Sequence, residues 1–197
     1  PSSAAKKRSP RQTAPAAAKP TKPPAPSKST TTRRAPAAGR PGTVSSDRAF
    51  PIVAVGASAG GLEAFNQLLR GLPTDAGMAF VFLQHLDARH ASHLPELLAK
   101  VTTMPVTEVT PGQPLAPNQV YVLPPNVLLT LVDGMAVLAP RETSSMAFKP
   151  IDTFCQSLAR ARGSLAIGII LSGTGADGTL GLKAIKAEGG VTFAQEE

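Results

Sequence analysis

A serine between glycines is the first group in this sequence that could do chemistry. The segment Gly56-Ala57-Ser58-Ala59-Gly60-Gly61 follows an apolar run, residues 51–57, and precedes an amphipathic run, residues 61–70. It meets the pattern G-x-S-x-G, in which flanking glycines let a sharp strand-to-helix turn expose the serine hydroxyl. The helix dipole and free N–H groups there favour a developing oxyanion. The pattern indicates Ser58 as a candidate nucleophile for acyl transfer.

Other interpretations of the same turn stay open. A dinucleotide-binding fingerprint needs glycine at position 58 and an acidic residue after the next strand, whereas Asp75 precedes that strand. A phosphate-binding P-loop needs lysine after Gly61, where Leu62 stands. The structural alternative is a glycine-rich turn in which Ser58 only caps the helix.

A nucleophilic serine needs a base and a group that orients this base. His85 follows the apolar run at residues 78–83, and Asp177 follows the most apolar run of the chain, residues 165–171. Because the carboxyl ends of parallel strands meet at one edge of a sheet, we expect Ser58, His85 and Asp177 to converge there. The structural alternatives are a histidine satisfied by the backbone and an aspartate that caps a helix.

The sequence offers little for metal binding. His90 and His93 have the spacing i, i+3, but no third ligand of suitable type lies near them, so we interpret them as solvated surface residues. One cysteine, Cys155, excludes an intramolecular disulfide and a thiolate zinc cage. We expect neither a metal nor an organic cofactor.

Short apolar runs and apolar residues at helical spacing predict the strands and helices that must position these residues. Strands are expected at 51–57, 78–83, 105–109, 119–123, 165–171 and 191–194, and helices at 61–70, 90–101, 151–161 and 179–188. Residues 127–131 and 135–138 flank Asp133-Gly134, a pair that favours a type I′ hairpin turn. The order predicts an α/β fold with a doubly wound, mostly parallel sheet and a β-hairpin insertion.

Charge separates the chain of 197 residues into two parts. Residues 1–46 hold ten Lys and Arg, no acidic residue, no aromatic residue and nine of the 20 prolines, whereas residues 47–197 have a net charge of −3. Such a segment buries too little apolar surface to offset the cost of ordering it. We predict a disordered basic tail, 1–46, and a folded domain, 47–197. The net charge of +7 therefore belongs to the tail.

The composition also bears on partners and location. Ten cations without aromatic residues would give only salt-sensitive, unspecific nucleic-acid affinity, so a solvated linker is the favoured interpretation of the tail. No apolar run reaches the roughly eighteen residues of a membrane span, and the N-terminus lacks the apolar region of a secretory signal. Prolines would break the amphipathic helix of a mitochondrial presequence. We expect a cytoplasmic protein.

Four motifs together carry a resemblance to a known family. The segment around Ser58, the pair Gln84-His85, the segment Val122-Leu-Pro-Pro125 and the segment Ser172-Gly-Thr-Gly-Ala-Asp177-Gly178 resemble the catalytic domain of chemotaxis protein-glutamate methylesterases, the CheB family. The resemblance covers about residues 50–197 and implies a Rossmann-like domain. It implies hydrolysis of glutamyl methyl esters on methyl-accepting chemoreceptor helices, and glutamine deamidation in many members. It assigns Ser58 as nucleophile, His85 as general base and Asp177 as orienting carboxylate.

This sequence departs from the family in three places. A basic tail stands where the best-known members have a receiver domain. The sequence of residues 176–183 is closer to that of hybrid proteins, which join this domain to a methyltransferase domain and sensory kinase modules. A fused or associated methyltransferase and kinase are therefore expected partners. Thr174 stands where methionine is common. The family continues beyond the position of Glu197, so we expect the domain to be incomplete at its C-terminus.

The motifs also suggest where an oxyanion would be bound. We expect the backbone N–H groups of Ala59 and Gly60, and one from the loop of Thr174, to face it. The predicted function is ester hydrolysis in chemotaxis-type signal adaptation. The alternative is a non-catalytic binding or regulatory module of a larger signalling protein.

Overall fold

The first and most apolar element, β1 (Ile52–Ala57), lies at the centre of a parallel sheet. The computed structural model describes residues 49–58, 60–84, 93–141, 148–171 and 176–196. Every residue of β1 is buried, as expected of a strand that has helices on both faces. The predicted tail, residues 1–46, lies outside the described residues.

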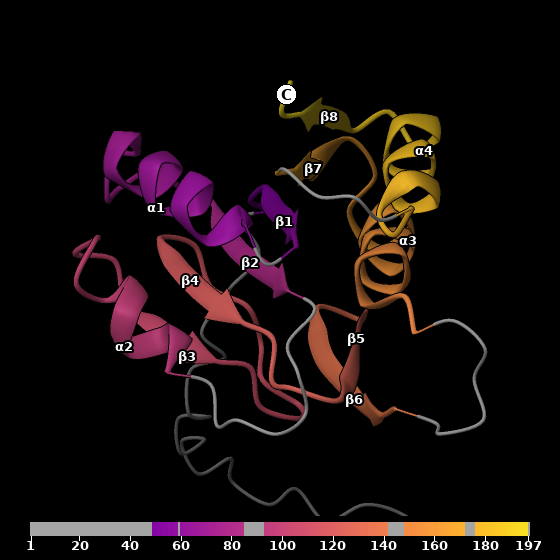
Figure 1. Cartoon of the computed structure of the whole chain (residues 1–197). Coiled ribbons are helices and arrows are strands. Elements are labelled where there is room, and N and C mark those ends of the chain that lie inside the picture. The colour runs from indigo at the N-terminus through magenta and orange to yellow at the C-terminus, as the bar shows by residue number, and fades with distance from the viewer. Residues whose placement is uncertain (1–48, 59, 85–92, 142–147, 172–175, 197) are drawn as a thin grey trace, which may run out of the picture. The chain divides into compact units, whose positions relative to one another are not determined.

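Six strands form this sheet in the order β3-β4-β2-β1-β7-β8, and all of their described pairings are parallel (Figure 1). The other strands are β2 (Ala79–Gln84), β3 (Val106–Glu108), β4 (Gln119–Val122), β7 (Ala166–Ile170) and β8 (Val191–Ala194). The chain passes from β1 to β2 on one side, whereas β7 lies on the other side of β1. This reversal makes the carboxyl end of β1 a topological switch point, where ligands bind in doubly wound folds.

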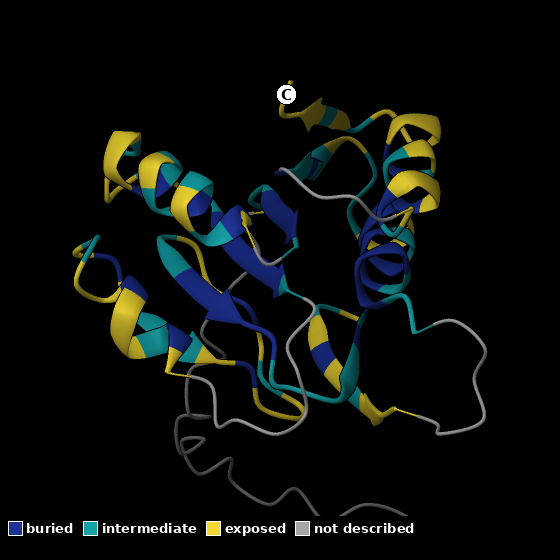
Figure 2. Ribbon diagram, viewed as in Figure 1, coloured by how far each residue is buried: buried dark blue, intermediate teal, exposed yellow. Residues whose placement is uncertain are grey.

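Helices cover both faces of the sheet. The face of Val53 and Val55 packs against α1 (Gly61–Gly71) and α2 (Leu94–Leu98). The face of Ile52 and Ala54 packs against α3 (Pro150–Arg162) and α4 (Thr179–Ala187). The buried residues gather along the sheet and on the inward sides of these helices (Figure 2). The α/β prediction is therefore confirmed.

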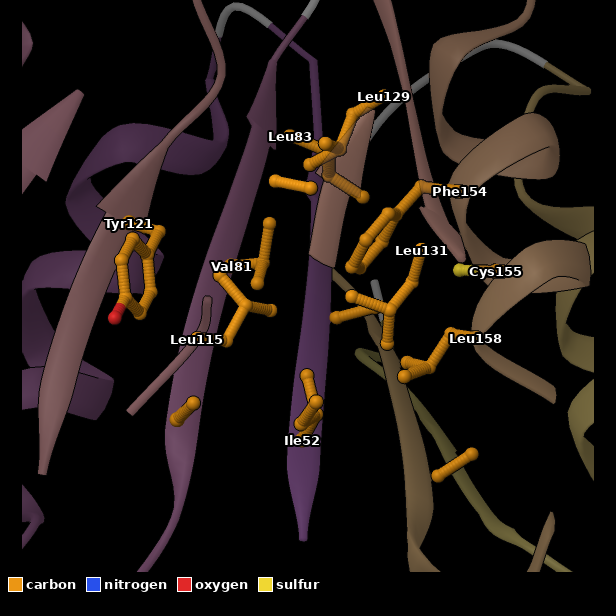
Figure 3. Close-up of a cluster of buried hydrophobic side chains, with 14 of the residues drawn as sticks. Ile52, Val81, Leu83, Leu115, Tyr121, Leu129, Leu131, Phe154, Cys155 and Leu158 are labelled. Atoms are coloured by element: carbon orange, nitrogen blue, oxygen red, sulfur yellow. The ribbon is translucent and has the colours of Figure 1, made fainter. Parts of the chain in front are cut away.

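The predicted hairpin forms a second, two-stranded sheet rather than an edge of the first. It comprises β5 (Val127–Val132) and β6 (Met135–Pro140), which pair antiparallel. Asp133 and Gly134 have φ values of 49° and 78°, which a type I′ turn requires. Leu129 and Leu131 of β5 face Phe154 and Leu158 of α3 in one apolar cluster (Figure 3).

Most predicted elements differ from the structure by one or two residues at an end, and the helix expected at 90–101, observed as Leu94–Leu98, differs by more. The helix expected at 90–101 ends at Leu98, where i→i+3 hydrogen bonds such as Val101 N–H to Leu98 C=O (2.9 Å) tighten the chain into a turn. The strand expected from residue 165 begins at Ala166, because a 3₁₀ turn, η1 (Gly163–Leu165), precedes it. Within the described ranges, no helix combines the length and the hydropathy needed to cross a membrane.

Helices α3 and α4 approach closely at Gly181. A Cβ atom at this position would lie 2.5 Å from Cys155 Cβ and 3.3 Å from Asp152 Cα. We expect Gly181→Ala to lower the free energy of unfolding by about 1–3 kcal/mol through overpacking. Gly71→Ala is the matched control, since nothing lies within 4 Å of a Cβ there. It should be neutral or stabilising by about 0.4–1 kcal/mol. Urea denaturation measures both, and equal effects would contradict the close approach of the helices.

Candidate active site at the carboxyl edge of the sheet

Ser58 stands at the switch point, directly after β1. Its side chain is half-buried, and its carbonyl accepts the Gly61 N–H at 2.9 Å, which closes the turn into α1. Helix α1 has Gly60 as its N-cap residue and no side-chain hydrogen bond at the cap. Gly60, and not Ser58, is therefore the N-cap residue of this helix.

Strand β2 brings its own carboxyl end beside Ser58. Ala57 pairs with Gln84, the last residue of β2, and Gln84 Nε2 donates to the Ser58 carbonyl at 3.4 Å. His85 is the next residue in the sequence and lies outside the described residues, as do Ala59 and Thr174. Gly60 is described and is exposed. The structure thus places the strand that leads to His85, but it does not place the imidazole.

Strand β7 borders the same end of β1. Gly56 pairs with Ile170, and the Leu171 N–H donates to the Gly56 carbonyl at 2.9 Å. A Cβ at Gly56 would lie 2.6 Å from Ile151 Cγ2 and 2.8 Å from Ile170 Cδ1. The first glycine of the serine motif is therefore needed because α3 packs directly on the end of β1.

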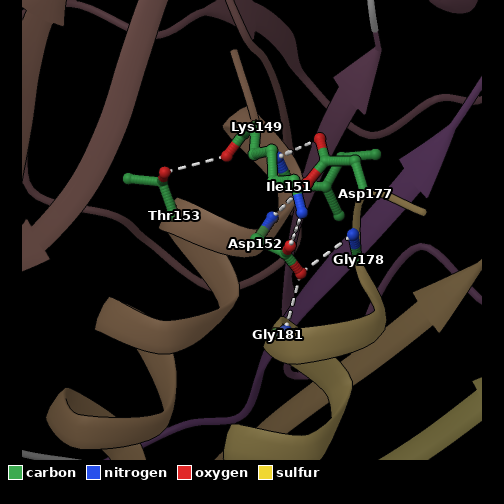
Figure 4. Close-up of polar contacts among 7 residues, drawn as sticks. All are labelled: Lys149, Ile151, Asp152, Thr153, Asp177, Gly178 and Gly181. Carbon is green, nitrogen blue, oxygen red and sulfur yellow. Dashed lines mark hydrogen bonds and ion pairs between the residues drawn. The ribbon is translucent and has the colours of Figure 1, made fainter. Parts of the chain in front are cut away.

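Asp177 binds the start of α3. Its Oδ2 accepts the Ile151 N–H at 3.0 Å, and its Oδ1 accepts the Asp152 N–H at 2.8 Å (Figure 4). These N–H groups belong to the first turn of α3, where a negative charge is favourable. The alternative prediction, that Asp177 caps a helix, is thus correct. The capped helix is α3, however, and not α4, which follows Asp177.

The Asp177 segment reaches the rim on which Ser58 stands. Gly178 has φ of +104°, and a Cβ there would lie 2.5 Å from Ile170 Cδ1 and 3.2 Å from Ile151 Cγ2. The same two isoleucines leave no space for a side chain at Gly56. The end of β1 and the segment after Asp177 therefore pack against the same pair of side chains.

Asp152 is a polar residue of this rim that the sequence analysis missed. Its side chain is 3% exposed, and its Oδ1 accepts the N–H groups of Gly178 at 2.9 Å and Gly181 at 2.8 Å. Its Oδ2 lies 3.6 Å from Lys149 Nζ. An aspartate in the first helical turn is common in any sequence, so the pattern alone gave no signal that this one would be buried.

The carboxylates also affect the neighbouring thiol. Cys155 is buried on α3. Desolvation, followed by the negative charges of Asp152 and Asp177, raises the pKa of the Cys155 thiol from 9.0 to about 12. The thiolate is therefore disfavoured at neutral pH, and Cys155 is a packing residue rather than a nucleophile.

Metal ligands do not gather in the part of the chain that the structure describes. No group of three or more His, Cys, Asp and Glu residues lies close enough there to hold an ion. His93 is exposed at the N-cap of α2, and His90 lies outside the described residues. The chemistry that this edge offers is that of a serine hydroxyl, backbone N–H groups and carboxylates.

This fold and site define a class of protein. Its members are doubly wound α/β domains with a serine at the switch point and an aspartate on the same rim. The family model for CheB methylesterase matches residues 53–197. The chain therefore belongs to the CheB methylesterase family.

Individual relatives agree with this family. The chain is 36% identical over 147 residues to a protein-glutamate methylesterase/protein-glutamine glutaminase of Pseudomonas putida, covering 74% of this chain and 44% of the relative. It is 39% identical over 147 residues to a protein-glutamate methylesterase/protein-glutamine glutaminase of Burkholderia lata, covering 74% of this chain and 43% of that relative. The chain thus spans less than half the length of these relatives.

A solved structure matches the fold. The CheB methylesterase catalytic domain of Thermotoga maritima superimposes with a TM-score of 0.66 at 26% identity, and the match covers 73% of this chain and 78% of that chain. The architecture described above is therefore that of a CheB catalytic domain.

The reactivity of Cys155 tests whether α3 and α4 pack closely around its thiol. Because the neutral thiol is favoured when folded, a disulfide reagent at pH 8 should label Cys155 at least about 100-fold more slowly in the native protein than in urea. Absorbance of the released thiol measures the rate. Labelling of the native protein as fast as that of the unfolded chain would show that the thiol is accessible and ionised.

Proposed function

We propose that this domain hydrolyses glutamyl methyl esters with Ser58 as the nucleophile. The observation that carries the proposal is the position of Ser58, directly after the central strand at the switch point, in a domain of the CheB methylesterase family. The relatives are named for glutamate methylesterase and glutamine glutaminase activities. The same acyl transfer would deamidate glutamine, with ammonia leaving in place of methanol.

In this proposal His85 is the general base and Asp177 orients it. The pairing of Ala57 with Gln84 supports the base, because the residues that follow these two are Ser58 and His85. The rim position of Asp177 supports the orienting role, since the backbone holds its carboxylate. A carboxylate has about four lone-pair sites, so Asp177 can accept a bond from an imidazole N–H besides those from Ile151 and Asp152.

The proposed reaction has two steps. Ser58 Oγ attacks the ester carbonyl carbon while its proton passes to His85, and the resulting tetrahedral oxyanion collapses. The carbon–methoxy bond breaks, and methoxide takes the proton from His85 and leaves as methanol. A water molecule, deprotonated by His85, then attacks the acyl-enzyme and releases a glutamate carboxylate and the free Ser58 hydroxyl.

Backbone N–H groups stabilise the oxyanion in this mechanism. We assign this role to Ala59 and Gly60, which follow the nucleophile, and to the loop of Thr174. One such donor is typically worth about 2.7–4 kcal/mol in the transition state. The position of Gly60 at the N-cap of α1 supports the assignment, because main-chain N–H groups at a helix start favour a negative charge.

Membership of the family supports a proposal for the substrate and partners. We propose methyl-accepting chemoreceptor helices as the substrate and residues 47–197 as the catalytic domain. A methyltransferase and a sensory kinase, fused or associated, would complete the adaptation system. The tail, residues 1–46, is proposed as a solvated linker.

Removing the Ser58 hydroxyl tests the nucleophile. Ser58→Ala should keep the wild-type unfolding midpoint and lose methanol release from a methyl-esterified receptor fragment by at least about 10³-fold. A fluorophosphonate probe should label the wild type at Ser58, and the label should be lost in His85→Ala. Mass spectrometry of the tryptic peptides locates it.

Ser164→Ala is the matched control, because Ser164 is exposed in η1 before the amino end of β7. It should keep full activity. Wild-type turnover by Ser58→Ala would remove the nucleophile assignment. Absence of labelling and of methanol release in the wild type would favour the non-catalytic binding module instead.

A further inference from the structure

Asp152 and Asp177 exchange hydrogen bonds between two helix starts. Asp177, just before α4, accepts two N–H groups of α3, and Asp152, in α3, accepts two N–H groups at the start of α4 (Figure 4). Neither helix has a side-chain hydrogen bond from its own N-cap residue. Each carboxylate therefore replaces the local cap of the other helix.

The bond to Gly178 acts directly on the geometry of Asp177. The Gly178 N–H belongs to the planar peptide unit whose carbonyl carbon is that of Asp177. When Asp152 Oδ1 accepts this N–H at 2.9 Å, it fixes the orientation of that peptide unit. The main-chain N–H of Asp152 itself binds the Asp177 carboxylate at 2.8 Å. One residue thus restrains Asp177 at both its backbone and its side chain.

Burial makes the loss of these hydrogen bonds costly. Asp152 is 3% exposed, and Gly178 and Gly181 are buried. Without the carboxylate, two buried N–H groups would lack an acceptor, and such groups are costly to leave unpaired.

We propose that Asp152 is a positioning residue for catalysis, which acts on the reaction through Asp177 and touches neither substrate nor nucleophile. The inference rests on the proposed function, in which Asp177 orients the general base. A small rotation of the Asp177 carboxylate would misalign the base with the nucleophile, and misplacements of about 1 Å can cost on the order of 100-fold in rate.

Two substitutions separate the hydrogen bonds of Asp152 from its charge. Asp152→Ala removes the acceptor and should lower kcat for methanol release from a methyl-esterified receptor fragment by about 10–100-fold, with KM changed by less than about threefold. Asp152→Asn keeps a carbonyl oxygen that can accept both N–H groups. It should restore kcat to within about fivefold of the wild type.

Ser157→Ala is the matched control on the same helix. Ser157 is also buried, at 5% exposed, and its Oγ donates to the Phe154 carbonyl at 2.8 Å and accepts the Leu131 N–H at 3.1 Å. The variant loses comparable hydrogen bonds at a distance from the carboxylate pair, so its kcat should equal that of the wild type.

A double-mutant cycle tests whether Asp152 acts through Asp177. In an Asp177→Ala background, Asp152→Ala should lower kcat by less than about twofold, because no carboxylate remains to be positioned. Equal losses in both backgrounds, or a wild-type kcat for Asp152→Ala, would overturn the proposal. If Asp152→Ala does not fold, Asp152→Leu, which has a similar shape and no acceptor, takes its place, and a folded Asp152→Leu protein with wild-type kcat would likewise overturn the proposal.

Ser58→Ala in the same series distinguishes the two proposals. If it is inactive while Asp152→Ala keeps wild-type kcat, the proposed function stands and only the positioning role fails. If Ser58→Ala keeps wild-type turnover, the proposed function fails, and the positioning role fails with it.

Discussion

The carboxyl edge of this domain depends on two carboxylates: Asp177, just before α4, binds the start of α3, and Asp152, in α3, binds the start of α4. Asp152 and Asp177 lie on segments 25 residues apart, and the four bonds between them and the helix starts are 2.8–3.0 Å long. A hydrogen bond to a charged group contributes about 1.5–3 kcal/mol, and a helix cap about 1 kcal/mol. Because the N–H groups at the start of each helix bind a carboxylate from the other segment, the starts of α3 and α4 depend on each other.

Three glycines, which have no side chain, make this exchange of hydrogen bonds possible. Glycine stands at positions 56, 178 and 181, and at each a Cβ would come within 2.6 Å of a neighbouring side-chain atom. The end of β1, the start of α3 and the start of α4 can therefore approach one another closely enough for carboxylates to reach main-chain N–H groups. The Gly56 of the serine motif belongs to this packing as much as to the turn that follows it. The glycines that suggest chemistry in the sequence thus have a steric reason as well.

Local patterns predicted most of the elements, because they depend on residues close in sequence. The apolar run of β1 and the turn at Asp133-Gly134 have the predicted structures, and Ser58 follows its strand as expected. Contacts between distant segments could not be predicted in the same way. Asp152 resembles an ordinary residue of a first helical turn, and only the fold reveals that its partners are Gly178 and Gly181. The packing of the hairpin on α3, in one cluster with residues of the sheet, is likewise a contact between distant segments.

Carboxylates bind two of the helix starts at this edge, and the third start, that of α1, follows the serine motif. Fixed carboxylates bind the starts of α3 and α4, and they use the positive ends of those dipoles for structure. The start of α1 has Gly60 as its N-cap and no side-chain hydrogen bond there. In the proposed reaction, the positive end of this helix dipole would stabilise the negative charge that forms beside Ser58. A permanent carboxylate at the start of α1 would repel the oxyanion that the proposed reaction forms, whereas the carboxylates at α3 and α4 serve the structure.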